Sequence, residues 1–179
     1  MTWNLPNKLT IMRAVMVPFF VAALLWKDGT VFSLRIIALV LFCAASFTDY
    51  LDGHIARKYN LVTNFGKFMD PLADKVLVMA AMCWFVECGK MPGWVLAIVL
   101  LREFAVSGMR LVAVEQGRVI AAAWSGKIKT ASTMVCLCLM MIDIPGWLVT
   151  ACCVIIVVTT VYSGIEYFVK NRDVFQNVR

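Results

Sequence analysis

The chain has 179 residues, of which 62% are hydrophobic and 16% are charged. Soluble domains are about 45–50% apolar and about 25% charged, so this composition excludes an ordinary soluble domain. Six membrane spans of about 20 residues each would use roughly 120 positions, which leaves no room for a large domain outside the bilayer. The net charge of +6 fits the basic cytoplasmic loops of membrane proteins, and we therefore expect no nucleic acid as a partner.

Six apolar runs divide the chain and predict six transmembrane helices. A helical fold is expected because backbone groups in lipid must satisfy one another's hydrogen bonds. The segment before the first run, from Trp3 to Lys8, is predicted to lie along the membrane interface. We thus predict an all-α integral membrane protein that forms a single domain over residues 1–179. The predicted spans cover residues 9–26, 33–50, 68–86, 94–114, 125–141 and 147–169.

The distribution of lysine and arginine predicts the orientation of these spans. With the N-terminus in the cytoplasm, the opposite side carries Lys27, Arg35 and Lys90. The cytoplasmic side then carries a larger group, namely Lys8, Arg13, Arg57, Lys58, Lys67, Arg118, Lys127, Lys129, Lys170, Arg172 and Arg179. Because cytoplasmic loops collect basic residues, we expect both termini in the cytoplasm.

Arg102 and Glu103 lie inside the fourth apolar run. A charged side chain that faces lipid without a partner is energetically costly. We therefore expect Arg102 to face the interior of the helix bundle, where it pairs with an acid or contacts the substrate.

Seven cysteines lie mostly within the apolar runs. None forms a Cys-x-x-Cys pair, which argues against zinc binding or a redox motif. We interpret these cysteines as small buried hydrophobic side chains.

Four aspartates mark the cytoplasmic ends of the second and third predicted spans. On helices, Asp49 and Asp52 are three residues apart and Asp70 and Asp74 are four apart, so each pair projects from one face. Two like charges about 4 Å apart repel by about 4 kcal/mol at an effective dielectric constant of 20. A hard divalent cation with oxygen ligands, Mg²⁺ or Mn²⁺, is the natural compensating charge.

Two simpler interpretations of these residues stay open. Asp70 followed by Pro71 could be a helix N-cap with proline at the first helical position, although capping explains one aspartate at most. Gly53, Ala56 and Gly66 let a ligand or a backbone approach closely, and small residues also mediate helix packing in membranes.

Together these residues form the pattern Asp49-x2-Asp52-Gly53-x2-Ala56-Arg57-x8-Gly66-x3-Asp70-x3-Asp74. The pattern resembles the signature of the CDP-alcohol phosphatidyltransferases, membrane enzymes that join an alcohol to a phosphatidyl group taken from a CDP-activated lipid. Residues 4–13, 101–110 and 124–130 also resemble the bacterial members that make phosphatidylglycerophosphate.

The resemblance implies roles for individual residues. Asp49, Asp52 and Asp70, with part of Asp74, would hold divalent metal, two ions per active site, and Asp74 would act as general base. The residues implied in binding the CDP-lipid are Asn7, Thr10, Gly53, Ala56, Arg57 and Gly66. Arg57 either touches the CDP phosphates or fixes the aspartate helix, and His54 falls at a variable position. The resemblance also implies a homodimer in the bacterial cytoplasmic membrane, with the active site facing the cytoplasm.

The implied acceptor, glycerol 3-phosphate, requires an anion site beside the metal. The candidates are Arg110, Arg118, Lys127 and Lys129, because arginine binds phosphate with two hydrogen bonds and lysine adds charge. The alternative explanation is that these residues belong to the general excess of lysine and arginine in the cytoplasmic loops of membrane proteins. Members that use inositol phosphate, serine or phosphatidylglycerol share the aspartates, so the acceptor site alone discriminates among them. A divalent-cation transporter is a remote alternative. It would place acids at several depths of the membrane, whereas the four aspartates cluster toward one surface.

Overall fold

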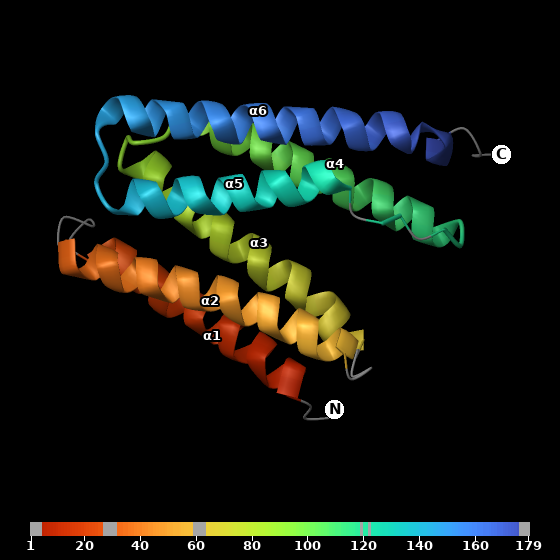
Figure 1. The fold of residues 1–179 in the computed structure, drawn as a ribbon, viewed down its shortest axis with the longest axis horizontal. Coiled ribbons are helices and arrows are strands. Elements are labelled where there is room, and N and C mark those ends of the chain that lie inside the picture. The colour runs from red at the N-terminus through yellow and green to blue at the C-terminus, as the bar shows by residue number, and fades with distance from the viewer. Residues whose placement is uncertain (1–4, 27–31, 59–63, 119, 122, 176–179) are drawn as a thin grey trace. The chain divides into compact units, whose positions relative to one another are not determined.

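A computed structural model describes residues 5–26, 32–58, 64–118, 120–121 and 123–175 of the chain (Figure 1). Its described side chains are those at 11–26, 32–48, 72, 75–118, 120–121 and 123–174. The described chain is all-α, as the sequence predicts. Its elements are α1 (Leu5–Leu25), α2 (Phe32–Lys58), α3 (Asn64–Glu87), α4 (Gly93–Glu115), α5 (Trp124–Met141), α6 (Gly146–Lys170) and a short 3₁₀ helix, η2 (Arg172–Phe175).

The chain divides into two compact units, Met1–Cys88 and Gly89–Arg179. In the first unit, α1 packs against both α2 and α3 (Figure 1). Ala38 and Ala45 on α2 are fully buried, because small side chains let the helices approach closely. The rings of Phe20 on α1 and Phe42 on α2 are buried as well, with their centroids 5.8 Å apart.

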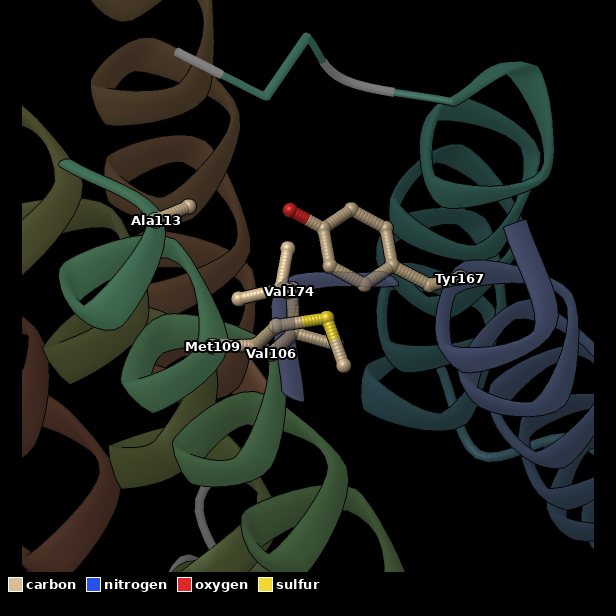
Figure 2. Close-up of a cluster of buried hydrophobic side chains, with 5 residues drawn as sticks. All are labelled: Val106, Met109, Ala113, Tyr167 and Val174. Carbon is tan, nitrogen blue, oxygen red and sulfur yellow. The ribbon is translucent and has the colours of Figure 1, made fainter. Parts of the chain in front are cut away.

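In the second unit, α6 packs against both α4 and α5. One end of the α4–α6 pair encloses a hydrophobic cluster of Val106, Met109, Ala113, Tyr167 and Val174. Figure 2 shows Tyr167 projecting from α6 toward α4, and Val174 of η2 lying among these side chains. Because Val174 is 1% exposed, η2 is anchored on the end of the helix pair.

The observed helices agree with the predicted spans except around the aspartates. α2 continues to Lys58, eight residues beyond the predicted end, and α3 already begins at Asn64. The interpretation of Asp70 and Pro71 as a helix start is therefore wrong, because α3 is formed before both residues. α1 begins at Leu5, so the part of the predicted interfacial segment that the structure describes is continuous with the first helix.

Among the described residues, one helix, α6, is long and apolar enough to cross a membrane by itself, with a mean hydropathy of 2.2 over its most apolar part. The described parts of α1 and α2 contain shorter apolar stretches, Ile11–Leu25 and Phe32–Thr48. The six predicted helices are therefore present, but among the described residues only α6 is clearly apolar enough to span a membrane. In α4, for example, the charged residues Arg102, Glu103 and Arg110 interrupt the apolar sequence.

The prediction that the cysteines are buried is right for some and wrong for others. All seven lie in the described part of the chain and form no disulfide; Cys136, Cys152 and Cys153 are buried and Cys138 is half-buried. The prediction is wrong for Cys43, Cys83 and Cys88, which are exposed. In a membrane helix an apolar side chain suits an outward position as well as an inward one, so hydrophobic context does not predict burial.

Candidate active site

The four signature aspartates lie on two helices of the first unit. Asp49 and Asp52 belong to α2, and Asp70 and Asp74 belong to α3; their side chains lie outside the described part of the structure. Because the backbone is helical at all four positions, the members of each pair share a face and stand about 4.5 and 6 Å apart along the helix axis. α2 and α3 contact each other and α1.

This donor set fits a divalent metal ion by its chemistry. Four carboxylates supply only hard oxygen ligands, which Mg²⁺ and Mn²⁺ prefer. The side chains that the structure describes contain no other group of three or more His, Cys, Asp or Glu that could hold a metal.

The residues predicted to bind the CDP-lipid come from all three helices of the first unit. α1 carries two of them, α2 three and α3 one. These residues are Asn7, Thr10, Gly53, Ala56, Arg57 and Gly66, and their side chains, like that of His54, lie outside the described part.

Arg13 on α1 is a residue of this unit whose importance the sequence prediction missed. Its side chain is completely buried, with an exposed fraction of 0%, whereas the charge pattern suggested an ordinary cytoplasmic arginine. Burial of a guanidinium is tolerated only where acids or hydrogen-bond acceptors compensate it, and the same unit carries the four aspartates. The available signal was the position of Arg13 inside an apolar run.

A charged cluster ties together the three helices of the second unit. The Glu103 Oε1 atom on α4 accepts hydrogen bonds from Arg102 Nη1 and from Lys129 Nζ on α5, both at 2.8 Å. Arg102 Nη2 also donates to Ser163 Oγ on α6 at 2.6 Å. The side chains of Arg102, Glu103 and Lys129 are 13%, 14% and 5% exposed. The prediction that Arg102 faces the interior and pairs with an acid is therefore confirmed.

Two glycines lie against the Arg102 side chain. A Cβ atom at Gly164 on α6 would lie 3.3 Å from Arg102 Cγ, and one at Gly126 on α5 would lie 3.4 Å from Arg102 Nη2. The first distance is tighter than most contacts of a Cβ atom, whereas the second is an ordinary van der Waals contact. The absence of a side chain at Gly164 thus leaves room for Arg102 against α6.

The end of α4 fixes the position of Arg118. Gly117 has a φ of +73°, the left-handed conformation that glycine adopts without strain. The Arg118 amide donates to the Ala113 carbonyl at 2.8 Å, and the Gly117 amide donates to the Val114 carbonyl at 2.9 Å. This pair of bonds is a Schellman motif, which ends α4 and fixes the backbone at Arg118.

A pocket of about 430 Å³ opens beside this turn. Its polar lining consists of Arg118 from the connection, Trp124 from α5, and Tyr167, Lys170 and Asn171 from α6 and its end. Its volume lies in the range of small-molecule sites. Two cations, an indole and a carboxamide make the pocket suited to a small anion.

Other groups support the lining of this pocket. Arg110 Nε donates to the Tyr167 hydroxyl at 3.1 Å, and its guanidinium lies 5.6 Å from the centre of the Tyr167 ring. Lys127 Nζ lies 4.6 Å from the centre of the Trp124 ring, a cation–π contact. Arg118 forms an ion pair with Asp173 of η2. The hydrogen bond from Arg118 lowers the pKa of Asp173, so this carboxyl stays ionised to lower pH than an ordinary aspartate.

The structure separates the four predicted phosphate-binding residues into two groups. Arg118 lines the pocket, and Arg110 and Lys127 each contact a residue that lines it. Lys129 instead lies in the buried cluster with Glu103, where it is 4% exposed.

Comparison with known proteins shows the family to which the chain belongs. The sequence pattern that defines the CDP-alcohol phosphatidyltransferases matches residues 3–162. The chain belongs to this family. The phosphatidyltransferase is 42% identical to the CDP-diacylglycerol–glycerol-3-phosphate 3-phosphatidyltransferase of Bacillus subtilis, over 96% of each chain. It is 38% identical to a probable phosphatidylglycerophosphate synthase of Mycobacterium tuberculosis, over 96% of this chain and 83% of that protein. An Escherichia coli protein with the same name as the Bacillus one is 38% identical over 76% of each chain.

Part of the pocket of this phosphatidyltransferase lies outside the segment that defines the family. Tyr167, Lys170 and Asn171 follow residue 162, where the family match ends. The sequence prediction missed them as site residues, because Tyr167 stands in an apolar run and Lys170 looks like a basic residue at a helix end. Their signal is positional: an α6 that packs beside α4 brings its last turn to the end of α4.

Proposed function

We propose that the protein transfers the phosphatidyl group of CDP-diacylglycerol to sn-glycerol 3-phosphate and releases phosphatidylglycerophosphate and CMP. The observation that carries the proposal is the similarity, over 96% of the chain, to relatives that bear this activity in their names. The signature aspartates and a basic pocket give the chain the residue types that such a reaction needs.

The proposal includes the placement in the membrane. Six crossings from a cytoplasmic N-terminus place the end of α2, the start of α3 and the connection between α4 and α5 on the cytoplasmic side. The whole chain, 1–179, then acts as one membrane domain in the bacterial cytoplasmic membrane, and we expect it to form a homodimer. The apolar length of α6 supports a membrane location.

In the proposed reaction, the acceptor hydroxyl oxygen attacks the phosphorus of the phosphatidyl group. The bond between that phosphorus and the oxygen of the CMP group breaks as the new bond forms, and Asp74 takes the proton of the hydroxyl. Asp49, Asp52, Asp70 and Asp74 would hold Mg²⁺ or Mn²⁺, two ions per site. When bound, the metal neutralises phosphoryl charge and orients the attack.

The remaining signature residues bind the CDP-lipid in this proposal. Gly53, Ala56 and Gly66 offer no bulky side chain, so a cytidine can approach the backbone of α2 and α3. Asn7, Thr10 and Arg57 would provide polar contacts to the CDP group, and Arg57 suits its phosphates because arginine binds phosphate in a bidentate manner.

The pocket beside Arg118 is the proposed acceptor site. Arg118 and Lys170 line it, and Arg110 and Lys127 lie behind its aromatic residues. This arrangement supplies positive charge to a phosphate and leaves the rest of the pocket for the glycerol group. The ion pair with Glu103 leads us to propose that Lys129 supports this site by holding α5 on α4.

Arg110→Ala is expected to raise the KM for glycerol 3-phosphate by about 10- to 100-fold, because it removes positive charge from behind the pocket and the hydrogen bond that holds Tyr167 in the lining. A hydrogen bond that involves a charged group contributes about 1.5–3 kcal/mol. The KM for CDP-diacylglycerol should change little. Steady-state kinetics with each substrate varied in turn gives both values. Lys90→Ala, which removes an exposed lysine paired with Asp143, is the matched control. A change confined to the CDP-diacylglycerol dependence would show that the acceptor site is elsewhere.

The proposed function is tested by offering the purified protein CDP-diacylglycerol, Mg²⁺ and one acceptor at a time. We expect CMP release with glycerol 3-phosphate. The alternatives are serine, inositol phosphate and phosphatidylglycerol, and CMP release with one of these but not with glycerol 3-phosphate would refute the assignment of the acceptor.

A further inference from the structure

The segment after α6 folds back onto the end of α4. Val174 is 1% exposed within the hydrophobic cluster, as Figure 2 shows. Gln116 Nε2 donates to the Val174 carbonyl at 3.1 Å. The Val174 amide in turn donates to the Asn171 carbonyl at 3.1 Å. These contacts of Val174 hold η2 on the end of α4, and the Asp173 carboxylate accepts further hydrogen bonds from the Asp173 and Val174 backbone amides.

Asp173 is therefore held at a fixed position beside the pocket, and it pairs with Arg118. The pairing is exposed, since the two side chains are 49% and 46% accessible. Exposed ion pairs contribute little to stability, so this one can be exchanged at small cost. A phosphate offers the same guanidinium more charge and a bidentate geometry.

The second cation of the pocket is paired in the same way. Lys170 forms an ion pair with Glu166, one turn earlier on α6. Both cations that line the pocket therefore have a carboxylate of the protein as partner. An anion that enters the pocket must compete with these carboxylates.

We propose that Asp173 is a specificity-determining residue that competes with the acceptor phosphate for Arg118. Asp173 pairs with the Arg118 guanidinium before the acceptor binds. The acceptor phosphate then displaces the Asp173 carboxylate, while Val174 keeps η2 docked on α4. Singly charged anions, such as the carboxylate of an amino acid, compete less well with Asp173 than a phosphate does. This inference rests on the proposed function, because it takes the pocket as the acceptor site.

Asp173→Asn removes the charge and keeps the size of the side chain. We expect the KM for glycerol 3-phosphate to fall by about two- to fivefold, the range that corresponds to an exposed ion pair. The KM for CDP-diacylglycerol should stay the same. In an Arg118→Gln background the substitution should have no effect on the KM for glycerol 3-phosphate, because the competing pair is already broken. Asp143→Asn, at an exposed acid paired with Lys90, is the control.

An unchanged or higher KM for glycerol 3-phosphate in Asp173→Asn would overturn the inference, and so would a decrease that persists in the Arg118→Gln background. Calorimetric titration with inorganic phosphate compares the parent with Asp173→Asn without turnover. It should show tighter phosphate binding to Asp173→Asn. A parent enzyme that releases no CMP with glycerol 3-phosphate would refute the proposed function, and the phosphate titration would still test the competition at Arg118.

Discussion

Asp74→Asn is expected to lower the rate of CMP release by about 10²–10⁴-fold, the usual contribution of a general base. Asparagine cannot accept the proton of the acceptor hydroxyl, but its amide oxygen keeps the size and one potential ligand atom of the aspartate. Binding of CDP-diacylglycerol in the presence of Mg²⁺ should therefore stay measurable. Turnover and lipid binding, measured on the same preparation, separate the loss of the base from the loss of the site.

Asp143→Asn is the matched control for this substitution. Asp143 lies between α5 and α6, with a φ of 58°, a left-handed conformation that asparagine adopts more readily than most residues. It pairs with Lys90 at 2.5 Å and is half exposed, so the control changes the same chemical group outside the proposed site. Activity of Asp74→Asn within a few fold of the parent would contradict the assignment of Asp74 as the base.

Glu103→Gln is expected to destabilise the protein by about 3–5 kcal/mol, because it removes the one carboxylate that the structure shows between Arg102 and Lys129. For a chain of this size the melting temperature should fall by roughly 6–20 °C. Thermal unfolding in detergent micelles measures the shift. The exposed pair of Lys90 and Asp143 should contribute less than about 1 kcal/mol, so Asp143→Asn again serves as the control.

A double substitution tests whether the loss arises from the ion pair. Lys129→Gln in the Glu103→Gln background removes a buried ammonium group, so the double variant should be more stable than the sum of the two single effects predicts. Additive effects would show that Glu103 and Lys129 do not interact energetically.

The sequence predicts the helices, the aspartate pairs and the burial of Arg102, because each depends on local spacing or on the cost of charge in lipid. It does not predict that Glu103 pairs with its neighbour Arg102, since adjacent helical residues do not face each other. That pairing depends on two long side chains that converge where α5 and α6 meet α4. The contribution of Tyr167 is equally hidden, because an apolar context gives no sign that its hydroxyl accepts a bond from Arg110.

The outward extent of α2 was missed for a related reason. The apolar run that predicts the second span ends at residue 50, yet the helix itself continues through Gly53 to Lys58. Glycine weakens a helix by only about 1 kcal/mol relative to alanine, and tertiary packing can offset that amount.

The two hydroxyl groups that α6 offers to α4 have a mechanical consequence. Ser163 accepts a hydrogen bond from Arg102, and one turn further along α6 Tyr167 accepts one from Arg110, so two hydrogen bonds join the two helices. A shift of one helix by one turn, about 5.4 Å, would break both bonds together. We therefore expect α4 and α6 to move as one rigid body.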